Sequence, residues 1–74
     1  MERYKGYWID GGAVIIHPNS RDWRSKGTVL KDGRLGSVVE VERLEGETFS
    51  TKEEAEAHGL ELCNRWVDER TRKM

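Results

Sequence analysis

The sequence is poor in cysteine, histidine and proline, and the first two shortages exclude whole classes of protein. A single cysteine, Cys63, cannot form an internal disulfide, so the chain lacks the cross-links of small secreted domains. Two histidines and one cysteine show no metal-ligand spacing, and we expect no metal and no cofactor. No stretch approaches the ~20 apolar residues of a membrane-spanning helix, and the N-terminus has no signal-peptide pattern. We therefore expect a cytoplasmic protein.

Motifs of catalytic sites are missing as well. The sequence contains no phosphate-binding glycine loop, no dinucleotide fingerprint and no serine-nucleophile elbow. Cys63 lies on an apolar helix stripe, where a thiol packs as a small hydrophobic group, and no neighbouring base that would activate it is visible. We therefore predict that the protein is not an enzyme.

Charge is what the chain has in abundance: 36% of its residues are charged, and the net charge is −1. Residues 1–36 carry seven basic and four acidic side chains, whereas residues 37–74 carry six basic and ten acidic ones. The acidic part suits a solvated helix and strand edge, and the basic part could meet an anion. The length suits one small domain, which we assign to residues 1–70, with a charged C-terminal tail at 71–74.

The segment "YKGYWIDGGAVIIH" predicts a β-hairpin, because aromatic and β-branched residues flank the turn signal Asp10-Gly11-Gly12. The turn can centre on Asp10-Gly11 or on Gly11-Gly12, and both choices give the same two faces. We assign the more apolar face to the core: Lys5, Tyr7, Ile9, Val14 and Ile16. The other face carries Tyr4, Trp8, Ala13, Ile15 and His17.

A second hairpin is predicted over residues 23–44. A five-residue loop from Asp32 to Gly36 is preferred to a two-residue turn, because it sets Lys26 against Glu42 as a cross-strand charge pair. The segment "EGE" at residues 45–47 is predicted to form a turn. This register places the following side chains on the core face: Trp23, Val29, Val39 and Val41.

The segment "FSTKEEAEAHGLELCNRWVDER" at residues 49–70 predicts an amphipathic helix that begins with a capping box of Thr51 and Glu54. Its apolar stripe comprises Ala55, Gly59, Leu62, Cys63 and Trp66, with Leu60 and Val67 on the flank. We therefore predict an α+β fold, a four-stranded antiparallel β-meander with one C-terminal α-helix packed across one face.

Both ends of the chain resemble a group of small uncharacterised bacterial proteins. The opening "YKGYWI" is similar to their Tyr-Lys/Arg-Gly-Tyr strand, and the closing segment is similar to their Phe-x-Thr-x-x-Glu-Ala and Arg-Trp-aliphatic-Asp pattern. The resemblance implies a bacterial origin and a shared fold, and it implies no activity. The Phe-x-Thr-x-x-Glu-Ala junction also resembles the N-terminal DNA-binding domain of phage-type integrases, in which a three-stranded sheet precedes a helix.

The sheet face without the helix is the predicted binding surface. Its candidate partner-binding residues are Tyr4, Trp8, His17, Arg24 and Lys26. Aromatic and basic side chains together are typical of nucleic-acid binders, whereas the apolar area also suits a protein contact, and Glu40 and Glu42 would offset the positive charge. We predict a non-catalytic binding or accessory module with a protein partner or a homodimer, and single-stranded or duplex nucleic acid as the alternative. We expect no membrane contact and no small-molecule substrate.

Overall fold

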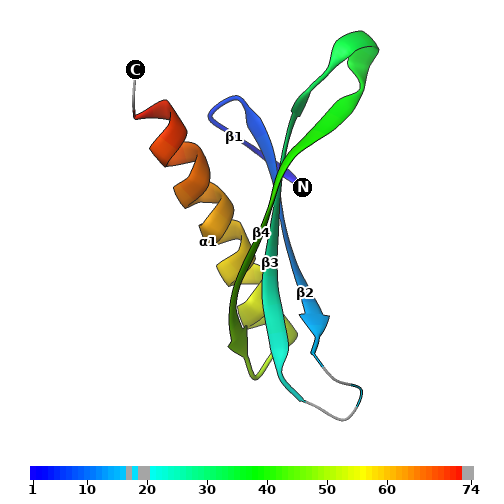
Figure 1. Ribbon diagram of the computed structural model, residues 1–74, viewed down its shortest axis with the longest axis vertical. Coiled ribbons are helices and arrows are strands. Elements are labelled where there is room, and N and C mark those ends of the chain that lie inside the picture. Colours follow the sequence, from blue (N-terminus) through cyan, green and yellow to red (C-terminus); the bar gives the residue numbers. More distant parts are fainter. Residues whose placement is uncertain (17, 19–20, 73–74) are drawn as a thin grey trace.

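The computed structural model of the chain describes residues 1–16, 18 and 21–72. They form a four-stranded antiparallel sheet, in the order β1-β2-β3-β4, with a helix packed across β2, β3 and β4 (Figure 1). The elements are β1 (Glu2–Tyr4), β2 (Tyr7–Ile15), β3 (Trp23–Asp32), the 3-10 turn η1 (Arg34–Gly36), β4 (Val38–Phe49) and α1 (Lys52–Thr71). The predicted α+β meander with one C-terminal helix is confirmed.

The first turn lies at Lys5-Gly6, and the predicted turn at Asp10-Gly11-Gly12 is wrong. Both turn residues have positive φ, 47° for Lys5 and 88° for Gly6. Strand β2 continues through the two later glycines, where Gly11 opposes Gly27 of β3. Glycine is needed there for space rather than for a turn, since a Cβ on Gly11 would lie 2.8 Å from Leu60 Cγ of the helix.

The uninterrupted strand inverts the predicted faces beyond Gly12, because side chains alternate along a strand. Tyr7 and Ile9 lie on the helix side, as predicted, and Ile9 is fully buried. Ile15 opposes Trp23 on the helix side, so its predicted place on the open face is wrong. Val14 opposes Arg24 on the open face, so its predicted core position is wrong.

The loop between β3 and β4 has the predicted five residues, but it begins one residue later. Asp32 pairs with Val38, and two register shifts then displace β4 along β3, one between Val29 and Leu30 and one between Arg24 and Lys26. The shifted loop and the bulge between Val29 and Leu30 together set Lys26 against Glu45 instead of Glu42.

Two valines of the predicted core are exposed. Val41 lies at the first bulge, whereas Val39 keeps its place on the helix side but is not covered by the helix. Val29 is fully buried, but Val39 and Val41 are 52% and 36% exposed. The segment predicted as a turn at residues 45–47 lies inside β4, where Gly46 packs against the helix: a Cβ there would lie 2.7 Å from Leu62 Cδ1.

Helix α1 begins at the predicted cap. The Thr51 hydroxyl accepts a hydrogen bond from the Glu54 backbone N–H at 3.2 Å and donates one to the Glu54 carboxylate at 2.9 Å. The helix ends at Thr71, one residue into the predicted tail. Its buried residues recur every fourth position, at Ala55, Gly59, Cys63 and Val67. Val67 therefore lies at the centre of the buried stripe rather than on its flank.

Candidate interaction surface

Tyr4 does not belong to the open face. Its hydroxyl donates a 2.7 Å hydrogen bond to Asp68 Oδ1 of the helix, and Lys5 Nζ lies 2.7 Å from the same oxygen. The turn at Lys5-Gly6 explains the error, because it sets Tyr4 opposite Tyr7, and opposed residues share a face. The predicted position of His17 lies outside the described residues.

The contact of Tyr4 and Lys5 with Asp68 shifts the pKa values of all three side chains. Hydrogen bonds from Lys5 and then Tyr4 lower the pKa of Asp68 below its usual value. The same hydrogen bonds raise the pKa of Tyr4 and of Lys5. The cluster attaches the N-terminal hairpin to the helix.

Trp8 lies on the open face, as predicted, but its side chain contacts Asp32 and Arg3 of the same chain. Its indole N–H donates to Asp32 Oδ1 at 2.9 Å, and the Arg3 guanidinium carbon lies 4.9 Å from the ring centroid. Arg3 also pairs with Asp32, with 3.0 Å between Nη2 and Oδ2. The hydrogen bond from Trp8, followed by that from Arg3, lowers the pKa of Asp32. A ring covered on one side by Arg3 offers only its other side for stacking.

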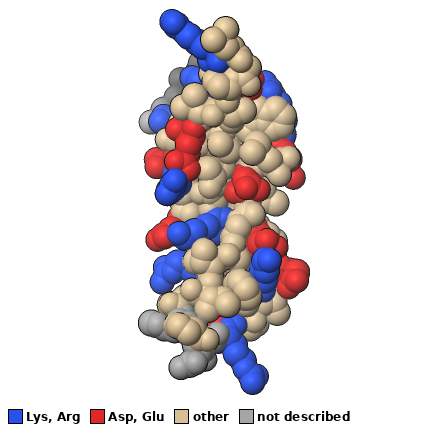
Figure 2. Space-filling model, turned by 90° about the vertical axis from the view of Figure 1, so that its right-hand side faces the viewer, with Lys and Arg blue, Asp and Glu red and all other residues tan. Residues whose placement is uncertain are grey.

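Arg24 and Lys26 also lie on the open face, because they alternate with the buried residues of β3. The basic side chains there are matched by acids: Lys26 Nζ lies 3.4 Å from Glu45, and Arg43 Nε lies 2.7 Å from Glu40. Figure 2 shows this side of the molecule, where blue and red side chains alternate along its length. The positive charge that a phosphate backbone requires is thus interrupted.

A hollow of about 460 Å³ lies on the β3–β4 hairpin. It is lined by Lys26, Gly27, Thr28, Arg43, Leu44 and Glu45. Two of these side chains, Lys26 and Glu45, form an ion pair with each other. The hollow therefore does not present charges of a single sign to a charged ligand.

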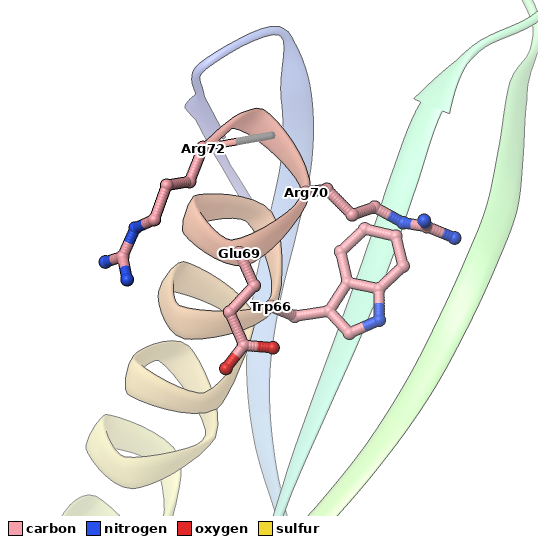
Figure 3. Close-up of a pocket in the computed structure, with 4 residues that line it drawn as sticks. All are labelled: Trp66, Glu69, Arg70 and Arg72. Carbon is pink, nitrogen blue, oxygen red and sulfur yellow. The ribbon is translucent and has the colours of Figure 1, made fainter. Parts of the chain in front are cut away.

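A second cavity, of about 500 Å³, lies at the C-terminal end of α1. Trp66 is half-buried, with its ring edge-on to Tyr7 at 5.8 Å and the Arg70 guanidinium 4.3 Å from its ring centroid. Figure 3 shows Trp66 pointing from the helix toward the β3–β4 hairpin, whereas Glu69 and Arg72 point away from it. The charged side chains do not converge, so the cavity lacks the arrangement of a small-molecule site.

The surroundings of Cys63 disfavour a reactive thiol. The side chain is fully buried, and its thiol contacts the carbonyl oxygens of Thr28 at 3.5 Å and Asp10 at 3.7 Å. Burial raises the pKa of the thiol, which disfavours the nucleophilic thiolate. Within the described part of the chain, no cluster of three or more His, Cys, Asp or Glu side chains could hold a metal ion. No helix among those residues is long and apolar enough to cross a membrane.

The outer edge of β4 is the surface that the sequence analysis missed. This strand has 12 residues and, among the strands that the structure describes, pairs only with β3. Its first half leans away from the helix toward the hairpin tip (Figure 1); Val38, Val39 and Val41 are exposed there, and Leu35 at the tip is fully exposed. Glu40 and Glu42 lie on opposite faces of this strand because the bulge between them breaks the alternation, whereas the sequence alone places them on one face.

No family model, curated protein or solved structure matches this chain. Its surface chemistry is therefore the basis for a proposed function.

Proposed function

We propose that this protein is a small non-catalytic binding module that acts by protein–protein contact along β4 and the projecting part of the β3–β4 hairpin. The exposed apolar side chains Leu35, Val38, Val39 and Val41 carry this proposal. Apolar side chains that gather on one projecting element are typical of protein contact surfaces. The buried, protonated thiol of Cys63 and the absence of a convergent polar site among the described residues support a non-catalytic role.

The conformation of Leu35 adds independent support. Its φ of 60° and ψ of 33° lie in the left-handed region, which costs a non-glycine residue of order 1 kcal/mol or more. The side chain makes no packing contact that would offset this cost, since it is fully exposed. A strained and solvated leucine at a hairpin tip is better explained by a contact with another molecule than by the stability of this domain.

The experiment is photo-crosslinking in cells, with a benzophenone amino acid at Val39 and a control at Glu53, an exposed position on the helix. We expect a protein adduct from position 39 that is absent from position 53. The proposal would be overturned if the variant with the probe at position 39 formed no protein adduct, or if both variants formed adducts in equal amounts.

Nucleic acid is the second candidate, favoured by Arg24 and Lys26 on the same face as Trp8. The pairing of Lys26 with Glu45 and the Arg3 side chain over Trp8 weigh against it. An oligonucleotide titration at low salt, followed by tryptophan fluorescence, separates the two candidates. Quenching that is lost at high salt, together with a nucleic-acid adduct from position 39, would favour this second candidate.

A further inference from the structure

We infer that the partner at β4 is a second copy of this chain, paired antiparallel through β4 and centred on Leu44. This inference rests on the proposed function, because it names the partner of the same surface. The pairing would join two four-stranded sheets into one of eight strands, with both helices on one side. Backbone groups along the outer edge of β4 would then gain the hydrogen-bonding partners that an edge strand lacks.

Symmetry leaves few registers for such a pairing. A two-fold axis perpendicular to the sheet passes between one residue of β4 and the same residue of the second copy, and opposed side chains must lie on the same face. A register centred on a charged residue sets that residue against its own copy. A register centred between two glutamates sets those glutamates against each other. These two faults disqualify the registers centred on Glu40, Val41, Glu42, Arg43, Glu45, Gly46 and Glu47.

The register centred on Leu44 opposes no like charges. It sets Arg43 of each copy against Glu45 of the other, which gives two cross-strand pairs of opposite charge on the open face. The Arg43 side chain is 80% exposed and pairs with Glu40 along its own strand, so it can turn toward the second copy. Leu44 meets its own copy on the helix side, where it already packs against the core.

The two bulges of β4 fit the same centre. One displaces the strand between Glu40 and Glu42, and the other between Glu45 and Thr48, so regular pairing is confined to the residues around Leu44. Centring on Leu44 brings the first bulge of each copy opposite the second bulge of the other. Bulges usually keep an edge strand from pairing, and this symmetric placement instead lets two such edges match.

The exposed Val39 also finds an apolar partner in this register. Val39 lies opposite Phe49 of the second copy, and both side chains project to the helix side, since they oppose Lys31 and Trp23 of β3. The projecting half of each hairpin would thus lie along the base of the other sheet. The second copy would thus cover Val39, an apolar side chain on the helix side that the helix leaves exposed.

Charge reversal tests the pairing. We expect sedimentation velocity to show a concentration-dependent dimer whose association constant falls about tenfold or more in Arg43→Glu and in Glu45→Arg. The double variant Arg43→Glu/Glu45→Arg restores the opposite-charge pairs and should restore the dimer. Arg65→Glu, an exposed change on the helix, is the matched control and should leave association unchanged. A protein that stays monomeric at high concentration, or reversals without effect, would overturn the inference.

Cysteine pairing tests the register itself. In a Cys63→Ala background, one protein carries Arg43→Cys and the other carries Glu45→Cys. Oxidation of the mixture should give a disulfide-linked heterodimer, because directly opposed residues lie within disulfide range, and each protein alone should give far less. Equal cross-linking in all three samples would refute the register. A protein adduct from Val39 that contains a different protein would overturn the inference and leave the proposed function standing.

Discussion

Gly59 of the helix lies directly on Gly27 of strand β3. A Cβ added at Gly27 would lie 2.6 Å from the carbonyl oxygen of Gly59 and 2.7 Å from Cys63 Sγ. A Cβ added at Gly59 would meet the carbonyl oxygen of Lys26, a backbone atom that cannot move aside cheaply. This pair of glycines therefore sets the spacing between helix and sheet.

Replacement of Gly59 by alanine should destabilise the domain, although alanine is the better helix former by ~1 kcal/mol. The added methyl group overpacks the interface with β3, and we expect a net loss of about 1–3 kcal/mol in urea unfolding. Ala57→Gly, at an exposed position of the same helix, is the control and should cost only the propensity difference. A Gly59→Ala variant that is more stable than the parent would contradict this close packing.

The neighbouring glycines of β2 should respond differently to the same change. Gly11→Ala places a methyl group against Leu60 and should cost about 1–3 kcal/mol, whereas Gly12 has no atom within 4 Å of an added Cβ. Gly12→Ala should be neutral or stabilise by up to ~1 kcal/mol, because it reduces the freedom of the unfolded chain. Thermal unfolding of the two variants measures the difference. A costly Gly12→Ala would instead indicate a turn at this point.

Asp68 should make the folded state sensitive to acid. Its pKa is lowered in the folded protein by Lys5 and Tyr4, so its contribution to stability is complete above the unfolded pKa of about 4. That contribution is lost as the pH falls through the lower, folded pKa. We expect Asp68→Asn to flatten the pH dependence of the unfolding free energy below about pH 4. Glu69→Gln, the adjacent exposed carboxylate, is the control, and an equal flattening there would refute the assignment.

The thiol of Cys63 should react only when the domain opens. It is fully buried, and its raised pKa keeps it protonated, so a thiol reagent should modify the native protein slowly and faster as urea is added. An exposed thiol, Arg65→Cys in a Cys63→Ala background, should react at once under the same conditions. Rapid modification of native Cys63 would show that the core is more open than its burial indicates.

The helix could be predicted because its signals are local. The capping box of Thr51 and Glu54 lies within one turn, and burial at every fourth residue follows from helix geometry. The first hairpin could not be predicted in the same way. A glycine that makes room for a distant helix and a glycine that forms a turn look alike in sequence, and Gly11 meets Leu60 only in the folded chain.

The residues of the candidate surface also divide into those that local sequence patterns predict and those that depend on features of the folded chain. Trp8, Arg24 and Lys26 were placed on the correct face because the alternation near each of them is regular. Tyr4 was misplaced because its face depends on a turn at Lys5-Gly6 that was read as strand. The edge of β4 was missed because its two bulges change which residues oppose β3, and no pattern in the sequence marks a bulge.

The hydrogen bond from Tyr4 to Asp68 joins residues 64 positions apart, whereas β2, β3 and β4 each pair with a neighbour in the chain. Closing so long a segment costs more chain entropy than closing a hairpin, so this contact should form after the rate-limiting step of folding. Interactions absent from the transition state govern how fast a native protein opens rather than how fast it forms. Loss of the Tyr4–Asp68 contact therefore shortens the lifetime of the folded state and leaves its rate of formation almost unchanged.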